Sequence, residues 1–512
     1  MDRDDAGVLS VAGERTRTMD RRWVTAALML VMVLASMEQT VTSTAMPTII
    51  GELHGFEHYA WVTSMYLLAC TVSMPLYGRL ADALGRKKVI LGATTLFAAA
   101  SVLAASAHGM VELIVYRGLQ GLGAGGIMPV VLTILGDIFT LEERAKIQGL
   151  FSAIWGTASI AGPALGAFLV NTMGWRSIFF VNLPFGALGL GVLAWKYHDH
   201  EKPHSTELDG VGVALLAVSS MALLAAVSGG ASWPWGVNVA LGAVAVVTLW
   251  VFVRHENRIE HPILPPGLLA NRAIGPSLVA SGILGVGVFA VDVYVPLYVQ
   301  GGQGGGAAAA ASVITPIMLM WASSGVIAAP LVVRWGFRKT ALIGAALVSV
   351  GFLGLLFCAK YNAPHWALTG TLAITGCGFG PASMSYLLAA QGAVAWQQRG
   401  VVTSGVQFFR TIGGAIGVGL LGTLFNVLIR PNVKHLSEIG VTPEKLLDPF
   451  LRSRLRPDVL TSIFAMISGG LIWVFAAMLV ISILGIVVTA AMAPGQADHA
   501  VSRTEAMEAM AG

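Results

Sequence analysis

Gly78-Arg79-Leu80-Ala81-Asp82-Ala83-Leu84-Gly85-Arg86-Lys87-Lys88 is a short basic stretch between two long apolar runs, 61–77 and 89–107. Lys and Arg collect on the cytoplasmic side of membranes, so this stretch predicts how the chain threads. Its glycines permit a tight turn between two helices. Asp82 is the one acid in the stretch and suits a position near a helix N-terminus, where the helix dipole favours a negative charge. The alternative is a solvated basic turn that only sets the topology.

The composition of the whole chain is that of a polytopic membrane protein. Of its 512 residues, 55% are hydrophobic and only 11% are charged, whereas about a quarter of the residues of a soluble protein are charged. The net charge of +4 comes from cations in loops between apolar runs, so it reflects membrane topology rather than nucleic-acid binding. Cys70, Cys358 and Cys377 each lie in an apolar run, which indicates neither a disulfide framework nor a metal site. No cofactor is expected.

About fourteen apolar runs approach the roughly 20 residues that a helix needs to cross a bilayer. They cover 23–46, 61–80, 88–107, 111–135, 146–170, 177–196, 209–229, 236–253, 274–298, 307–330, 340–359, 366–389, 402–428 and 463–491. An even number predicts that both termini lie on the same side, the cytoplasm. The short loops expected outside contain only the cations Arg176 and Lys360. The basic segment 430–458 is also expected outside, and long loops escape the positive-inside rule.

The chain contains an internal echo of its basic stretch. Gly336-Phe337-Arg338-Lys339 follows the tenth run as Gly85-Arg86-Lys87-Lys88 follows the second, with Val333 in the place of Asp82. Repeated halves are typical of secondary transporters. The predicted organisation is a tail at 1–22, a six-helix bundle at 23–200, an inserted hairpin at 201–272, a second six-helix bundle at 273–491 with an outer loop at 430–462, and a tail at 492–512.

The spacing Gly-x-Leu-x-Asp-x-x-Gly-Arg-Lys at 78–87 resembles the signature loop of the major facilitator superfamily. The resemblance implies an all-α membrane fold of two six-helix bundles, and the fourteen-helix layout is similar to the drug:proton antiporter branch. In that family the acid and base of the loop hold the cytoplasmic ends of the bundles together and release them during transport. The resemblance therefore assigns conformational gating to Gly78, Asp82, Gly85 and Arg86.

Glu38 lies in the first predicted helix, about 22 Å along it from Trp23 at 1.5 Å per residue. A carboxylate within the bilayer costs at least ~2.5–3.5 kcal/mol, so it is expected to face the bundle interior and to have a function. The alternative is a structural acid that is hydrogen-bonded to Gln39 or Thr40. The stretch from Glu38 to Pro47 is similar to the family's acid-x-Thr-x-x-x-x-x-x-Pro element, in which the acid is usually Asp. That similarity implies proton coupling by Glu38.

Arg117 lies near the outer end of the fourth predicted helix. Because Arg stays charged, it needs an acid, carbonyl groups or water, and Glu38 lies at a comparable depth. Arg117, Gln120 and Gly121 match the family's Arg-x-x-Gln-Gly pattern, which implies a role in proton movement to and from the acid. The alternative is a fixed structural counter-ion.

The fifth predicted helix contains Gly162-Pro163 and Gly166. Glycines let another helix pack closely, and proline removes a backbone hydrogen bond, which favours a bend. Together with Gly174-Trp175-Arg176 and the string from Phe179 to Gly186, these residues resemble the antiporter motif of the fourteen-helix branch. The resemblance implies a gating role for Gly162, Pro163 and Gly166 in an exporter.

Two further charges lie in the predicted second bundle. Asp292, toward the outer end of the ninth run, is a second proton site or a docking point for a cationic substrate; the alternative is an interfacial acid that reaches water. Arg410 lies about 12 Å from the inner end of the thirteenth run, in a string that begins at Gln407 and resembles the same branch. We expect Glu38, Asp292, Gln407 and Arg410 to contact the substrate.

The motifs exclude several classes of protein. The chain contains no GxxxxGK[ST] string and therefore no nucleotide-driven motor of that kind, and no polar constellation with catalytic spacing indicates an enzyme. The leading hypothesis is a plasma-membrane antiporter, working as a monomer in the bilayer without nucleic acid, that exports hydrophobic, cationic drugs or toxic compounds in exchange for protons. The alternatives are a lipid or metabolite exporter on the same scaffold, and a non-transporting sensor or receptor.

Overall fold

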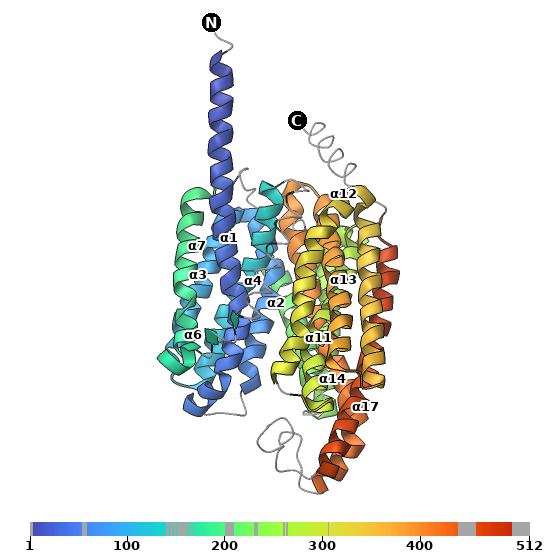
Figure 1. Cartoon of the computed structure of the whole chain (residues 1–512). Coiled ribbons are helices and arrows are strands. Elements are labelled where there is room, and N and C mark those ends of the chain that lie inside the picture. Colours follow the sequence, from blue (N-terminus) through green and yellow to red (C-terminus); the bar gives the residue numbers. More distant parts are fainter. Residues whose placement is uncertain are drawn as a thin grey trace. The chain divides into compact units, whose positions relative to one another are not determined.

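The computed structural model describes residues 4–53, 59–139, 143, 147, 150, 161–162, 165–166, 168–199, 209–229, 234–259, 262, 265–305, 307–438 and 457–493. Over these residues the regular secondary structure is entirely helical (Figure 1). The chain divides into two compact units. Unit 1 comprises Met1–Thr140, Ile154–Gly210 and Trp396–Gly405; unit 2 comprises Leu141–Ala153, Val211–Ala395 and Val406–Gly512. The predicted domain boundaries remain a prediction.

The described helices of unit 1 are α1 (Asp4–Leu53), α2 (Tyr59–Leu84), α3 (Arg86–Ala105), α4 (Met110–Ile138), α6 (Ser177–Phe180) and α7 (Asn182–Lys196). Glycines bring α4 close to two neighbours. A Cβ on Gly121 would lie 2.3 Å from the carbonyl oxygen of Tyr66 in α2, and one on Gly123 would lie 2.6 Å from the backbone nitrogen of Phe97 in α3. Larger residues would therefore push the helices apart.

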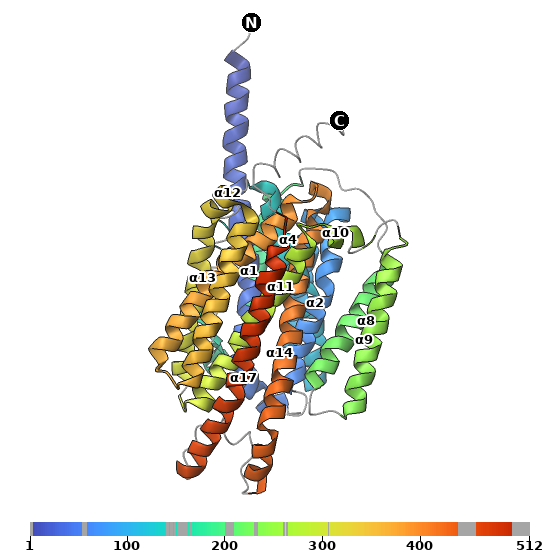
Figure 2. The same ribbon diagram turned by 90° about the vertical axis from the view of Figure 1, so that its right-hand side faces the viewer.

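The described helices of unit 2 are α8 (Gly210–Gly229), α9 (Trp235–Glu256), α10 (Pro266–Ala270), α11 (Gly275–Leu297), the π-helix η2 (Tyr298–Gly302), α12 (Ala307–Lys360), α13 (His365–Gly392), α14 (Arg399–Glu438) and α17 (Pro457–Ala490). The short helix η3 (Trp396–Gln398) and the first residues of α14 belong to unit 1. Helices α8 and α9 run side by side (Figure 2), where the Ser219 hydroxyl donates to the carbonyl of Ala245 at 3.0 Å.

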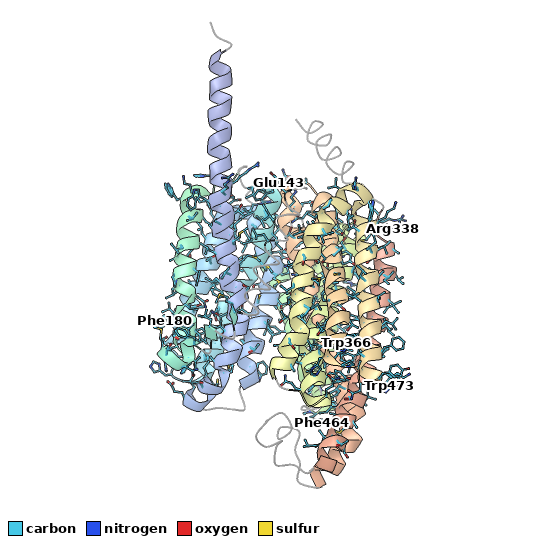
Figure 3. All side chains as sticks on the ribbon, viewed as in Figure 1. Glu143, Phe180, Arg338, Trp366, Phe464 and Trp473 are labelled. Atoms are coloured by element: carbon cyan, nitrogen blue, oxygen red, sulfur yellow. The ribbon has the colours of Figure 1, made fainter. Side chains whose placement is uncertain are left out.

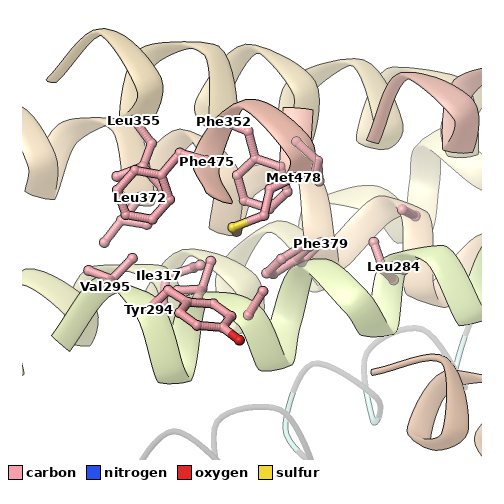
Figure 4. Packing of buried hydrophobic residues seen from close by; sticks show 14 of the residues in the cluster. Leu284, Tyr294, Val295, Ile317, Phe352, Leu355, Leu372, Phe379, Phe475 and Met478 are labelled. Carbon is pink, nitrogen blue, oxygen red and sulfur yellow. The ribbon is translucent and has the colours of Figure 1, made fainter. Parts of the chain in front are cut away.

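The core of unit 2 is apolar and aromatic. Phe352 of α12, Phe379 of α13 and Phe475 of α17 are each no more than 1% exposed and lie among Leu284 and Met478 (Figure 4). By contrast, many large apolar side chains point away from the units, as Figure 3 shows for Trp366 and Trp473. Apolar residues on the outer surface of a helix are expected where that surface contacts lipid.

The internal echo in the sequence has a structural counterpart. Gly85 precedes α3 with φ 92°, and Gly336 interrupts α12 with φ 79°. Both values lie in the region that residues with a Cβ rarely adopt. The two copies of the glycine-base stretch thus share a backbone conformation that glycine adopts without strain. Because of Gly336, α12 consists of two helices, as the runs 307–330 and 340–359 predicted.

Ten of the described helical stretches are long and apolar enough to cross a membrane, the stretch 309–360 among them; the predicted count of fourteen spans remains a prediction. Helix α1 begins well before the predicted span 23–46, because helical structure continues through polar sequence that a search for apolar runs ignores. For the same reason α14 and α17 extend into the predicted outer loop 430–462. Most of the predicted span 146–170 lies outside the described residues.

Candidate functional site

A group of polar side chains is buried inside unit 1, and we call it the Glu38 network. Its members are Glu38 and Thr42 of α1, Ser101 of α3, Arg117 and Gln120 of α4, and Asn182 of α7. At its centre, Nη1 of Arg117 donates to Oε1 of Glu38 in an ion pair. The two side chains are only 1% and 2% exposed. The pairing that their comparable depth suggested is therefore present, and their transport roles remain a prediction.

Glu38 accepts two further hydrogen bonds. The Thr42 hydroxyl donates to Oε1 at 2.8 Å, and Nδ2 of Asn182 donates to Oε2 at 2.6 Å. Thr42 lies one helical turn beyond Glu38, where side chains four residues apart meet. The expected neighbours Gln39 and Thr40 have side chains outside the described part of the structure.

Arg117 is held from three sides. Besides Glu38, its Nη1 donates to Oε1 of Gln120 at 2.5 Å, and its guanidinium lies 4.3 Å from the ring centre of Tyr66. Gln120 in turn donates to the Ser101 hydroxyl at 2.8 Å. A cation over an aromatic face is stabilised by the ring quadrupole, more so away from water.

The hydrogen bonds around the Glu38 carboxylate all point toward it. Ionised Glu38 only accepts hydrogen bonds, and its described partners Thr42, Arg117 and Asn182 all donate to it. A protonated carboxyl carries its own donor and no charge. A proton on Glu38 would therefore remove the negative charge that faces Arg117.

A second group of charges joins the end of α2 to the start of α3, and we call it the Arg86 cluster: Asp82, Arg86, Asp137, Trp396 and Arg399. Arg86 is fully buried; its Nη2 lies 3.0 Å from Oδ1 of Asp82 and its Nε lies 3.0 Å from Oδ2 of Asp137. Nη2 also donates to the carbonyl of Trp396 at 2.9 Å, and the guanidinium lies 3.6 Å from that ring's centre. Arg399 lies 3.5 Å from the other oxygen of Asp137.

Asp82 lies at a helix N-terminus, as expected, and the helix is α14. Its carboxylate accepts from the backbone N–H groups of Gly400 at 3.1 Å and Val401 at 2.9 Å. The contact is close because two glycines face each other: a Cβ on Gly78 would lie 2.7 Å from the carbonyl oxygen of Gly400, and one on Gly400 would lie 2.6 Å from the carbonyl oxygen of Gly78. Of the residues assigned to gating, Gly78, Asp82 and Arg86 therefore meet segment 396–405.

The remaining predicted site residues belong to neither group. Gly162 and Gly166 are buried, and Pro163 lies outside the described residues. In unit 2, Gln407 is buried, Arg410 is half-buried and Asp292 is exposed. Over the described residues, neither Asp292 nor Arg410 forms an ion pair, so the structure does not join them to each other.

Several members of the two groups were missed by sequence reasoning. Asn182 appeared only as one letter of a motif string, although a polar amide in an apolar run is a detectable signal. Asp137 at the end of α4 and Trp396 before α14 carried no signal of partnership with Arg86, because they are far from it in sequence.

A third polar contact, which we call the Glu52 clasp, fixes the end of α1 beyond the predicted span 23–46. Glu52 accepts from Arg176 and, at 2.8 Å, from the indole N–H of Trp175. Arg176 also donates to the carbonyl of Ala107 at 3.2 Å. The hydrogen bonds from Arg176 and Trp175 lower the pKa of the Glu52 carboxyl below its usual 4.5.

The Glu52 clasp predicts a pH-dependent stability difference. An acid with a lowered pKa stabilises the fold above the unfolded-state pKa, and this stabilisation is lost as the pH falls through the lowered value. Glu52→Gln is therefore expected to lower the Tm slightly at pH 7, because exposed pairs contribute little, and to match wild type well below pH 4.5. Thermal melts of both proteins across pH test this; a difference that grows toward acid pH would contradict it.

These features define a class: a helical membrane protein with buried charges and with a glycine-base stretch that occurs in two structurally similar copies. Comparison with known proteins gives the family. The family description "Major Facilitator Superfamily" matches residues 28–418. The chain belongs to the major facilitator superfamily, a family of transporters and not of enzymes.

Curated relatives and solved structures agree with this. Multidrug transporter protein MdtP of Bacillus subtilis (strain 168) is 35% identical over 402 residues, which cover 78% of this chain and 74% of the relative. Multidrug resistance protein 3 of the same organism is 28% identical over 481 residues, covering 91% and 94%. The structure of the human organic anion transporter MFSD10 (TETRAN) superposes with a TM-score of 0.58 at 14% identity, covering 90% of this chain and 99% of that one, and shows the likeness of fold alone.

Proposed function

We propose that this transporter exports hydrophobic, cationic compounds across the plasma membrane in exchange for protons. The observation that carries the proposal is the ion pair of Glu38 and Arg117, which is buried among transmembrane helices. Removing two charges from water costs free energy that can exceed the gain from their mutual attraction, so such a pair is poorly explained by stability alone. Charged side chains within a membrane typically mark proton and substrate pathways. The names of the two Bacillus subtilis relatives, a multidrug transporter protein and a multidrug resistance protein, support drugs as the cargo.

In the proposed cycle, a proton from outside binds Glu38, breaks its pair with Arg117 and displaces the substrate. Release of the proton inward re-forms the pair and resets the transporter. Asp292, Gln407 and Arg410 contribute substrate contacts from the second half of the chain. Asp292 forms no ion pair with another described residue, and a free carboxylate suits a cation because opposite charges attract.

The Arg86 cluster is the proposed gate. Its ion pairs and the two hydrogen bonds to α14 hold segment 396–405 against α2, α3 and α4 in one state. These contacts break when the transporter changes the side of the membrane to which it opens. The glycine-proline element at 162–166 allows helices to shift during this change. A few closely fitted polar contacts suit a two-state element, because such contacts are either formed or absent.

The proposal is tested with purified protein in proteoliposomes under an imposed pH gradient. We expect a lipophilic cationic dye to move uphill only when the gradient is present, and to stop when an ionophore collapses it. Movement of acyl lipids but not dye would replace the proposed cargo with lipid. Tight binding of dye without any flux would indicate a sensor and overturn the proposal.

A further inference from the structure

The inference concerns the N-terminus of α3, which carries Arg86, and it rests on the proposed gating role of the Arg86 cluster. The first N–H groups of a helix have no partner within the helix. Gly85, at the N-cap position, has no side chain that could accept hydrogen bonds from them. Instead, the backbone N–H of Lys87 donates to the carboxylate of Asp199, with distances of 3.1 and 3.4 Å to its two oxygens. A carboxylate at a helix N-terminus also interacts favourably with the helix dipole.

Asp199 comes from a different part of unit 1. It lies three residues beyond the last residue of α7, Lys196, at the start of the chain segment that leads to α8. Asp199 therefore binds the backbone of the first turn of α3, whereas the bonds of Arg86 are made by its side chain.

Tyr197 lies two residues before Asp199. It is only 4% exposed. Burial first, then the charges of Asp199 and Asp137, raise the pKa of the Tyr197 phenol. The phenol therefore stays protonated.

The contacts of the Arg86 guanidinium depend closely on the position of α3. Its guanidinium meets Asp82, Asp137 and the carbonyl of Trp396 at 3.0, 3.0 and 2.9 Å. Hydrogen bonds weaken steeply as distance and angle depart from these values. Arg86 is the first residue of α3 and Lys87 is the second, so the bond from Lys87 to Asp199 fixes the backbone from which the guanidinium reaches its partners.

We propose that Asp199 is a positioning residue of the gate. It holds the first turn of α3 so that Arg86 engages Asp82, Asp137 and segment 396–405 together. Asp199 is then part of the gating device, and it does not touch the transported molecule in this role.

The test measures backbone hydrogen exchange and transport with the full-length protein. Asp199→Asn keeps the shape of the side chain and removes its charge, and Asp199→Glu keeps the charge. Glu112→Gln is the matched control, because Glu112 likewise accepts from a backbone N–H, that of His108 at 3.0 Å, beside the start of α4.

We expect Asp199→Asn to speed exchange roughly tenfold both in the first turn of α3 and in residues 398–404, as for loss of a charged hydrogen bond. The maximal rate of dye transport by Asp199→Asn should differ from that of wild type, while its KM for the dye stays near the wild-type value. Asp199→Glu should keep hydrogen exchange in both regions near wild type, and Glu112→Gln should alter exchange in neither region.

Two results overturn the positioning role. In the first, Asp199→Asn speeds exchange in α3 alone, which makes Asp199 a local helix cap. In the second, exchange rises throughout unit 1, which makes it a general structural residue. If wild type moves no dye in exchange for protons, the proposed function fails, but the exchange comparison still decides whether Asp199 orders segment 398–404.

Discussion

Glu38→Gln is expected to abolish uphill export of a lipophilic cation while binding and downhill exchange of the cation persist. Gln has nearly the same shape as Glu, and its amide oxygen can still accept from Thr42 or Asn182. It cannot bind or release a proton near neutral pH, so the step that couples proton entry to substrate displacement is lost. We expect the export rate under a pH gradient to fall at least about 100-fold, or about 2.7 kcal/mol at 1.36 kcal/mol per tenfold.

The variant also leaves the charge of Arg117 without its acid. Removing one partner of a buried pair costs about 3–5 kcal/mol, and Gln120 and Tyr66 offset part of this by retaining their contacts with Arg117. The Tm and dye binding of Glu38→Gln are therefore measured first. Glu38→Asp is the matched control, since it keeps the acid with one methylene less, and we expect it to retain part of the coupled transport.

Gly78→Ala is expected to produce the second large effect, a loss of transport through disruption of the Arg86 cluster. The new Cβ would lie 1.9 Å from the Ser404 hydroxyl and 2.7 Å from the carbonyl oxygen of Gly400. The hydroxyl can rotate away, but the carbonyl belongs to the backbone of α14. Segment 396–405 must therefore move, which weakens the hydrogen bonds from Gly400 and Val401 to Asp82.

Overpacking of this kind typically costs about 1–3 kcal/mol, so the state with a formed cluster should lose roughly one to two powers of ten in population. Dye efflux and hydrogen exchange in residues 398–404 measure the two consequences. Gly92→Ala in α3 is the matched control, because nothing lies within 4 Å of its added Cβ. Normal transport and exchange in Gly78→Ala would show that the glycine contact is not part of a gate.

Much of the site was predictable because a charged side chain within a membrane needs an opposite charge, a polar group or water beside it. Glu38 and Arg117 lie at similar depths in apolar helices, and neither charge is stable there alone, so their pairing could be expected before the fold was known. The glycine-base stretch and its echo at Gly336 likewise predicted two halves, and the matching positive φ angles of Gly85 and Gly336 agree with that expectation.

What could not be predicted depends on contacts between distant parts of the chain. Asp199 and Asp137 lie 112 and 51 positions from the residues of α3 that they contact, and Trp396 lies 310 positions from Arg86. No local pattern relates such residues, because folding alone brings them together. Helix ends were also misplaced where α1 and α14 continue into polar sequence, since hydropathy reports on the membrane rather than on helicity.

The measurement that tests the central claim most directly is proton movement in proteoliposomes that contain an entrapped pH-sensitive dye. Addition of a lipophilic cation to one side of wild-type vesicles is expected to drive protons to that side, with a matching change of the internal pH. In Glu38→Gln vesicles the cation should still bind, yet the internal pH should not change. Equal proton movement in wild type and Glu38→Gln would contradict the assignment of Glu38 as the coupling acid.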